Sequence, residues 1–249
     1  MIKRVKRASC VSLVLAGLLI SGAIVSCSVE PSSETKPAEK AGSAISEGYV
    51  ELQSQDRLQQ KTFLIFGDSL AAAYKMPTDQ GWVSLLAAKL AESCPDVRVV
   101  NASISGETTA GGLARLPALL AESQPSVVLL ELGANDGLQG KQISQITSNL
   151  QKLIDHVKEF GAQTVLAGIR IPPNYGARYT EPFYAQFETL AKTNNIAHIP
   201  FLLEPVATQG KYKQADGIHP NVDAQPLILR YVLPYLKPVL KESFSCTVS

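Results

Sequence analysis

Clusters of basic residues are scarce in this chain of 249 residues. Only the first seven residues hold such a cluster, and 23 lysines and arginines against 22 aspartates and glutamates leave a formal net charge of +1. A protein that binds the phosphate backbone of nucleic acid presents a basic patch or stripe on its surface. The balance of charge therefore disfavours a nucleic-acid partner.

Histidine and cysteine are also few, with three and four copies, and they form no cluster with the spacing of metal ligands. The sequence thus implies no metal and no other cofactor. It contains no internal repeat. The hydrophobic share of 45% is enough for one sizeable core, and a second full domain is not expected in a chain of this length.

The amino terminus has the composition of an export signal. A positive leader, Lys3 to Arg7, precedes an apolar stretch, residues 11–25, which is too short to span a bilayer comfortably. The segment Ile24-Val25-Ser26-Cys27 resembles the bacterial lipobox, in which a small residue precedes a cysteine that becomes lipidated. We therefore predict that residues 1–27 are a lipoprotein signal peptide and that Cys27 carries the lipid. A plain cleaved signal with an incidental cysteine and an uncleaved anchor are the alternatives.

Residues 28–60 are rich in Ser, Glu, Lys, Pro and Gln and poor in large apolar residues, so they cannot bury enough surface to fold alone. We predict a flexible tether there and one folded domain over residues 61–249. Ser28, directly after the cysteine, resembles the pattern for outer-membrane sorting in Gram-negative lipoproteins. We therefore expect an exported, periplasm-facing lipoprotein that is held at the outer membrane by its N-terminal lipid anchor.

The rest of the chain alternates short apolar runs with amphipathic segments. Strands are predicted over residues 62–67, 97–100, 127–132, 165–169 and 196–201. Helices are predicted over 81–93, 108–121, 182–195 and 224–240, with a further long helix from Ile143 that ends before Gly161. Pro117 is predicted to kink or interrupt the second of these helices. This alternation predicts a flavodoxin-like three-layer α/β/α sandwich with a five-stranded parallel sheet.

Two cysteines remain after Cys10 and Cys27 are assigned to the export signal. In a flavodoxin-like strand order of 2-1-3-4-5, the first and last helices lie on the same face of the sheet and both run away from the site. Cys94 and Cys246 would then meet at the opposite end of the sheet. Because an exported chain meets an oxidising compartment, these two cysteines are a candidate disulfide.

Polar residues follow the first predicted strand at the point where it ends. The apolar run stops at Gly67, and Asp68 and Ser69 follow at the strand's carboxyl end, where open α/β sheets bind their ligands. A serine there could be a nucleophile if a base, an orienting acid and oxyanion donors lie nearby. A strand followed by an ordinary polar turn is the simpler interpretation.

The base is best sought among the three histidines. His156 lies within the long helix and His198 in the fifth strand, so a boundary position and a packed position are expected for them. His219 lies in a polar loop three residues after Asp216, whose carboxylate can accept from one ring nitrogen while the other faces Ser69. The alternative is an Asp-Gly turn followed by an unremarkable His-Pro pair.

Three groups could stabilise an oxyanion beside Ser69. These are the N–H of Ser69 itself, the N–H of Gly106 and the side-chain amide of Asn135. Glycine and asparagine are also common turn residues, so each position alone carries little weight. Their joint occurrence at strand ends indicates nucleophilic acyl transfer.

These residues resemble a known family. The segments Gly67-Asp-Ser-Leu70, Gly106, Gly133-Ala-Asn-Asp136 and Asp216-Gly-Ile-His219 are similar, in order, to the four signature blocks of the SGNH, or GDSL, hydrolase superfamily. More narrowly, residues 101–108, 112–120, 131–137 and 216–221 resemble its bacterial multifunctional esterases, which have thioesterase, lysophospholipase and arylesterase activities. The similarity covers about residues 62–240. Departures are Ala71, Ala73 and Ala134, where the family often has Ser, Gly and Gly.

The resemblance implies Ser69 as nucleophile, His219 as base and Asp216 as its orienting acid. It implies a serine esterase, acting as a monomer without a cofactor, that hydrolyses fatty-acyl esters, lysophospholipids and thioesters. Candidates for an apolar acyl groove are Leu138, Ile171 and Tyr175. A carbohydrate acetylesterase is the alternative within enzymes, and a noncatalytic envelope lipoprotein that binds lipid or a cell-wall partner is the alternative outside them.

Overall fold

A computed structural model of the chain describes residues 61–248. The predicted signal peptide, its Cys27 and the predicted tether over 28–60 lie outside the described residues. None of the helices within 61–248 is long and apolar enough to cross a bilayer.

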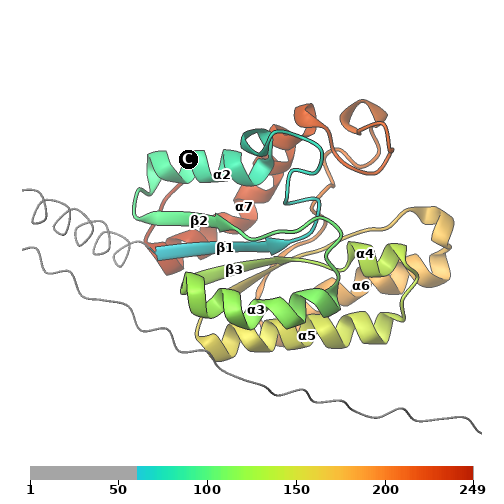
Figure 1. Ribbon diagram of the computed structural model, residues 1–249, viewed down its shortest axis with the longest axis horizontal. Coiled ribbons are helices and arrows are strands. Elements are labelled where there is room, and N and C mark those ends of the chain that lie inside the picture. Colours follow the sequence, from blue (N-terminus) through green and yellow to red (C-terminus); the bar gives the residue numbers. More distant parts are fainter. Residues whose placement is uncertain (1–60, 249) are drawn as a thin grey trace, which may run out of the picture. The chain divides into compact units, whose positions relative to one another are not determined.

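Five parallel strands form the central sheet (Figure 1). They are β1 (Lys61–Gly67), β2 (Val97–Asn101), β3 (Pro125–Glu131), β4 (Gln163–Ala167) and β5 (Ala197–Ile199), in the order β2-β1-β3-β4-β5. The predicted three-layer fold and its flavodoxin-like strand order are confirmed. β1 and β3 lie inside the sheet, and their continuous apolar runs are buried on both faces, as parallel strands between two helical layers require.

Helices cover both faces of the sheet. On one face lie α2 (Trp82–Ser93) and α7 (Gln225–Phe244), and on the other lie α3 (Thr109–Ser123), α5 (Ile143–Phe160) and α6 (Ala177–Asn194) (Figure 1). Alternate side chains of β1 enter the two cores: Phe63 and Ile65 pack under α2 and α7, whereas Leu64 and Phe66 pack under the other three helices. The remaining short elements are α4 (Ala134–Leu138) and 3₁₀ turns at Thr78–Gln80, Pro173–Tyr175, Gly210–Tyr212 and Val222–Ala224.

Several boundaries differ from the predicted ones, and proline is involved at two of them, the start of α6 and the end of β5. Pro117 does not interrupt α3, and α6 begins at Ala177, so that Pro182 lies inside the helix. A proline removes one backbone hydrogen bond, but each of these helices buries an apolar face that stabilises it across the gap. β5 ends at Ile199 because Pro200 has no N–H to donate to the ladder.

The two cysteines outside the signal region lie together at the end of the sheet remote from Ser69. Cys94 follows α2, Cys246 follows α7, and the two form a disulfide with their Cα atoms 5.6 Å apart. Close by, the Lys61 ammonium donates to the carbonyl oxygen of Ser243 at 3.1 Å. The start of β1 and the ends of both helices are therefore tied at one edge, which leaves the carboxyl ends of the strands to the site.

Candidate active site

The turn after β1 presents the candidate nucleophile. Ser69 follows the buried Asp68, and its Oγ lies 2.9 Å from Nε2 of His219. Two hydrogen bonds fix this turn: the Leu70 N–H donates to Oδ1 of Asp68 at 3.1 Å, and the indole N–H of Trp82 donates to the Leu70 carbonyl at 3.0 Å. The serine hydroxyl therefore lies on a turn that hydrogen bonds hold in place, and it faces the imidazole of His219.

The loop between β5 and α7 supplies that base and its partner. Nδ1 of His219 lies 2.8 Å from Oδ2 of Asp216, while Oδ1 of Asp216 accepts the backbone N–H groups of Ile218 and His219 at 2.9 and 3.0 Å. These backbone bonds, the His219 N–H first, lower the pKa of Asp216 to about 2. Asp216 stays ionised at any ordinary pH, so it holds the imidazole in the tautomer whose Nε2 can take the Ser69 proton.

Residues far away in the sequence hold this loop against the nucleophile turn. Gln214 donates from Nε2 to the carbonyls of Tyr74, at 2.9 Å, and Pro220, at 3.0 Å. The ring of Tyr74 also packs against the imidazole of His219 in a tilted arrangement, with ring centroids 4.3 Å apart. Sequence reasoning did not find Tyr74 or Gln214, because their contacts join positions about 140 residues apart and no local pattern marks them.

A buried glutamine makes a second tie of the same kind. Gln225, at the start of α7, accepts the backbone N–H of Trp82 on Oε1 at 3.0 Å and donates from Nε2 to the Asn221 carbonyl at 3.1 Å. Since Trp82 also holds Leu70, one chain of hydrogen bonds runs from the nucleophile turn to the loop that carries His219. A buried amide with both ends satisfied fixes geometry at little cost in stability.

The three predicted oxyanion donors come together beside Ser69. Among residues 61–248, neither the Ser69 N–H nor the Gly106 N–H donates to a backbone carbonyl. Nδ2 of Asn135 lies 3.1 Å from Oδ2 of Asp68 and 2.9 Å from the Glu107 carbonyl, so the amide sits between the neighbours of Ser69 and Gly106. Gly106 has φ of 83°, a left-handed conformation that glycine adopts without strain. The N–H groups of Ser69 and Gly106, which have no backbone acceptor, thus flank an amide that is fixed by Asp68 and Glu107.

Two carboxyl groups are buried beneath the nucleophile turn. Glu131, at the end of β3, accepts the Asp68 N–H on Oε2 at 3.2 Å, and its Oε1 has no hydrogen-bond partner among residues 61–248. Burial raises the pKa of Asp68 to about 7 and raises the pKa of Glu131 well above 4.5. Asp68 also accepts from Leu70 and Asn135, which favour its charge, so we assign the retained proton to Glu131.

Glu131→Gln is expected to change how stability depends on pH. Folding raises the pKa of Glu131, so the unfolded chain loses this proton at a lower pH than the folded chain does. Its contribution to stability is complete below pH 4.5 and is lost as the pH rises toward the folded-state pKa, at about 1.4 kcal/mol per pH unit. Glu131→Gln has no proton to release, so its stability relative to the wild type should increase over this range.

Urea unfolding of both proteins between pH 4 and 8 measures this difference. Glu122→Gln, on the exposed side of α3, is the matched control and should follow the wild type at every pH. If the free energy of unfolding depended on pH in the same way for the wild type and Glu131→Gln, Glu131 would be ionised in the folded chain.

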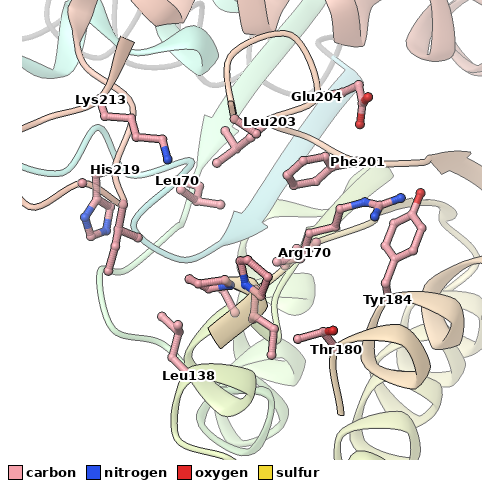
Figure 2. Close-up of a pocket in the computed structure, with 18 of the residues that line it drawn as sticks. Leu70, Leu138, Arg170, Thr180, Tyr184, Phe201, Leu203, Glu204, Lys213 and His219 are labelled. Atoms are coloured by element: carbon pink, nitrogen blue, oxygen red, sulfur yellow. The ribbon is translucent and has the colours of Figure 1, made fainter. Parts of the chain in front are cut away.

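A cavity of about 760 Å³ opens beside Ser69 and His219 (Figure 2). Leu138 and Ile171 line it, as predicted for the acyl groove, together with other apolar residues: Leu70, Ile169, Pro172, Phe201 and Leu203. Tyr175 is not among the lining residues. It is 38% exposed, and its hydroxyl donates to the Leu138 carbonyl at 2.8 Å, so it supports the wall from behind.

Charged side chains also line the cavity, and sequence reasoning missed them. They are Arg170, Glu181, Glu204 and Lys213. Each comes from a loop or helix start whose placement over the cavity depends on the whole fold. No group of three or more His, Cys, Asp or Glu side chains within 61–248 could hold a metal ion.

Comparisons with known proteins identify the family of the chain. The profile of the GDSL-like Lipase/Acylhydrolase family matches residues 65–225. The chain belongs to this family. It is 51% identical to esterase TesA of Pseudomonas aeruginosa, over 72% of this chain and 90% of that one. It is 46% identical to thioesterase 1/protease 1/lysophospholipase L1 of Escherichia coli K12, over 72% of this chain and 85% of that one.

A solved structure shows the same fold. The crystal structure of TesA matches with a TM-score of 0.70 and 50% identity, covering 72% of this chain and 100% of that one. As a member of the GDSL-like acylhydrolases, this chain is an ester hydrolase. One departure from the family pattern has a visible consequence: Ala73 has φ of 56°, a conformation in which glycine would be unstrained.

Proposed function

We propose that the chain hydrolyses fatty-acyl esters, lysophospholipids and thioesters through an acyl-enzyme on Ser69. One observation carries this proposal: the hydrogen-bonded series Ser69, His219 and Asp216, with distances of 2.9 and 2.8 Å, opens into a largely apolar cavity of about 760 Å³. A nucleophile with an oriented base supplies the chemistry, and the apolar cavity supplies room for an acyl chain.

The mechanism has two steps. Ser69 Oγ attacks the carbonyl carbon while Nε2 of His219 takes its proton, and the developing oxyanion is met by the N–H groups of Ser69 and Gly106 and by the Asn135 amide. His219 then passes the proton to the leaving alcohol or thiol. In the second step, water gives a proton to His219 and attacks the acyl-enzyme; the bond to Ser69 Oγ then breaks, the acid is released, and His219 returns the proton to Oγ.

The substrate class rests on the cavity and on relatives. Leu138, Ile171 and Leu203 supply an apolar wall next to the nucleophile, which suits a fatty-acyl chain more than a sugar. The names of relatives include esterase, arylesterase, thioesterase and lysophospholipase. We further propose that the chain is exported and anchored at the outer membrane through Cys27, since the leader and lipobox support this location. Lysophospholipids would then be within its reach, and cytoplasmic thioesters would not.

A chain-length series on the full-length protein tests the substrate class. We expect kcat/KM for nitrophenyl esters to rise from acetyl to medium-length acyl chains, because each buried CH₂ adds about 0.8 kcal/mol of binding, up to the length that the cavity accepts. We also expect fatty acid to be released from a lysophospholipid, with Ser69→Ala as the blank. A preference for acetyl alone, with deacetylation of sugars and no action on lysophospholipid, would instead assign a carbohydrate acetylesterase.

A further inference from the structure

Lys213 belongs to the same loop as His219. An antiparallel bridge pairs Lys213 with Pro220, and the next residue, Gln214, donates its N–H to the His219 carbonyl at 2.8 Å. The backbone of Lys213 is therefore held in a fixed relation to the base. Its side chain is one of those that line the cavity, and Figure 2 shows its ammonium group pointing inward on the same side as His219.

The charge of Lys213 is not neutralised by a neighbour. Within residues 61–248 no carboxylate lies within ion-pairing distance of it. Asp216 is engaged by His219, and Glu204 lies across the cavity, on the side of Arg170 (Figure 2). Arg170 itself stacks on Tyr184, with its Cζ 3.7 Å from the ring centroid. The cavity thus has an unpaired cation on the wall that carries the base.

The side of the cavity that carries His219 and Lys213 faces the leaving group of the ester. In the proposed mechanism His219 gives its proton to the departing oxygen, so the alcohol part of the ester must lie on the His219 side, while the acyl chain follows the apolar wall of Leu138 and Ile171. Lys213 therefore meets the alcohol and not the acid. A neutral hydroxyl of this alcohol can only accept a hydrogen bond from the ammonium group, whereas an anionic group would also gain the attraction between opposite charges.

We propose that Lys213 makes the site select acyl esters whose alcohol carries a phosphate close to the ester bond. The inference rests on the proposed function and specifies its substrate class. In a 1-acyl-glycerophospholipid the phosphate is attached only three carbons from the ester oxygen, which suits a cation on the same loop as the base. A lysine ammonium is a compact charge that binds phosphate oxygens, and a partly enclosed cavity reduces its screening by salt.

The test compares two substrates that differ only in the phosphate. These are 1-acyl-glycerol 3-phosphate and 1-acyl-glycerol with the same acyl chain, in neutral detergent micelles, with the full-length protein. We expect the ratio of kcat/KM for the phosphate-bearing ester to that for the neutral ester to fall about tenfold in Lys213→Gln, equal to about 1.4 kcal/mol. Lys213→Arg should restore most of the ratio. Added salt should lower the ratio in the wild type more than in Lys213→Gln.

A neighbouring lysine provides the matched control. Lys211 is two residues away and lies over the ring of Tyr212, with its Nζ 4.8 Å from the ring centroid, and it does not line the cavity. Lys211→Gln removes the same charge from the loop and should leave the ratio unchanged. An equal fall in both variants would assign the effect to the micelle surface and overturn the proposal.

The remaining outcomes separate the two proposals. A wild type that cleaves neither glycerol ester would refute the proposed function, whereas a wild type that cleaves both, with a ratio insensitive to Lys213→Gln, would refute only the role of Lys213. Acyl-coenzyme A, whose phosphates lie beyond a long arm, distinguishes the source of the phosphate. If Lys213→Gln lowered kcat/KM for this thioester by the same factor, the assignment to a phosphate near the ester bond would be overturned.

Discussion

Replacing Ser69 by alanine is expected to lower kcat by about 10⁴ to 10⁶ while the protein remains folded. The hydroxyl lies 2.9 Å from Nε2 of His219, and without it the proposed acyl-enzyme cannot form. The oxyanion donors and the cavity remain, so a small residual rate over that in water should persist. Hydrolysis of a nitrophenyl ester and of a lysophospholipid by the full-length chain measures the loss.

The matched control for this variant is Ser84→Ala. Ser84 is partly buried on α2, away from the site, where its hydroxyl donates to the Thr78 carbonyl at 2.7 Å, and its loss should leave kcat within about twofold of the wild type. Thermal unfolding of all three proteins shows whether Ser69→Ala is folded. A folded Ser69→Ala protein that retains more than a tenth of the activity would show that another group is the nucleophile.

Asn135→Ala is expected to lower kcat by about 10² to 10³, with a much smaller change in KM. Both N–H groups of the amide are directed at neighbours before substrate arrives, one at Asp68 and one at the Glu107 carbonyl, so the amide is already in place and only one of these bonds must be exchanged for the substrate oxygen as negative charge develops. Its contribution is made in the transition state and hardly at all in the bound ester. Steady-state kinetics on one ester, with kcat and KM resolved, give the comparison.

Asn135→Asp sharpens this prediction. A carboxylate has nearly the same shape but cannot donate when ionised, and it would repel both Asp68 and the oxyanion, so its loss should be at least as large as that of alanine. Asn194→Ala, on α6 and paired with Gln151, is the control for loss of an amide elsewhere. Equal effects on kcat and KM in Asn135→Ala would indicate a role in substrate binding instead.

The main features of the fold were predictable because they depend on local patterns. Runs such as Phe63–Phe66 and Val127–Leu130 are apolar on every residue, which is what a parallel strand between two helical layers needs. Strand and helix alternate, and each candidate catalytic residue follows a strand or lies in the last polar loop. Parallel strands bring those ends to one edge, so their proximity followed from the order of elements alone.

Other features depend on contacts between distant parts of the chain and could not be predicted. Nothing near Gln225 in the sequence indicates that it joins Trp82 to Asn221, and nothing near Glu131 shows that its carboxyl will lie under Asp68. Proline interrupts these helices less than expected, because Pro117 and Pro182 lie inside helices that packing on the sheet stabilises. Tyr175 was placed in the acyl groove from its loop alone, but its direction depends on the turn that carries it.

The central claim is that Ser69, activated by His219, forms a covalent acyl-enzyme. Treating the full-length chain with a fluorophosphonate, followed by peptide mass spectrometry, tests it most directly. We predict a single adduct on the peptide that contains Ser69, formed at a rate that falls steeply in His219→Ala and absent from Ser69→Ala. An unlabelled wild type, or an adduct on any other residue, would contradict the account.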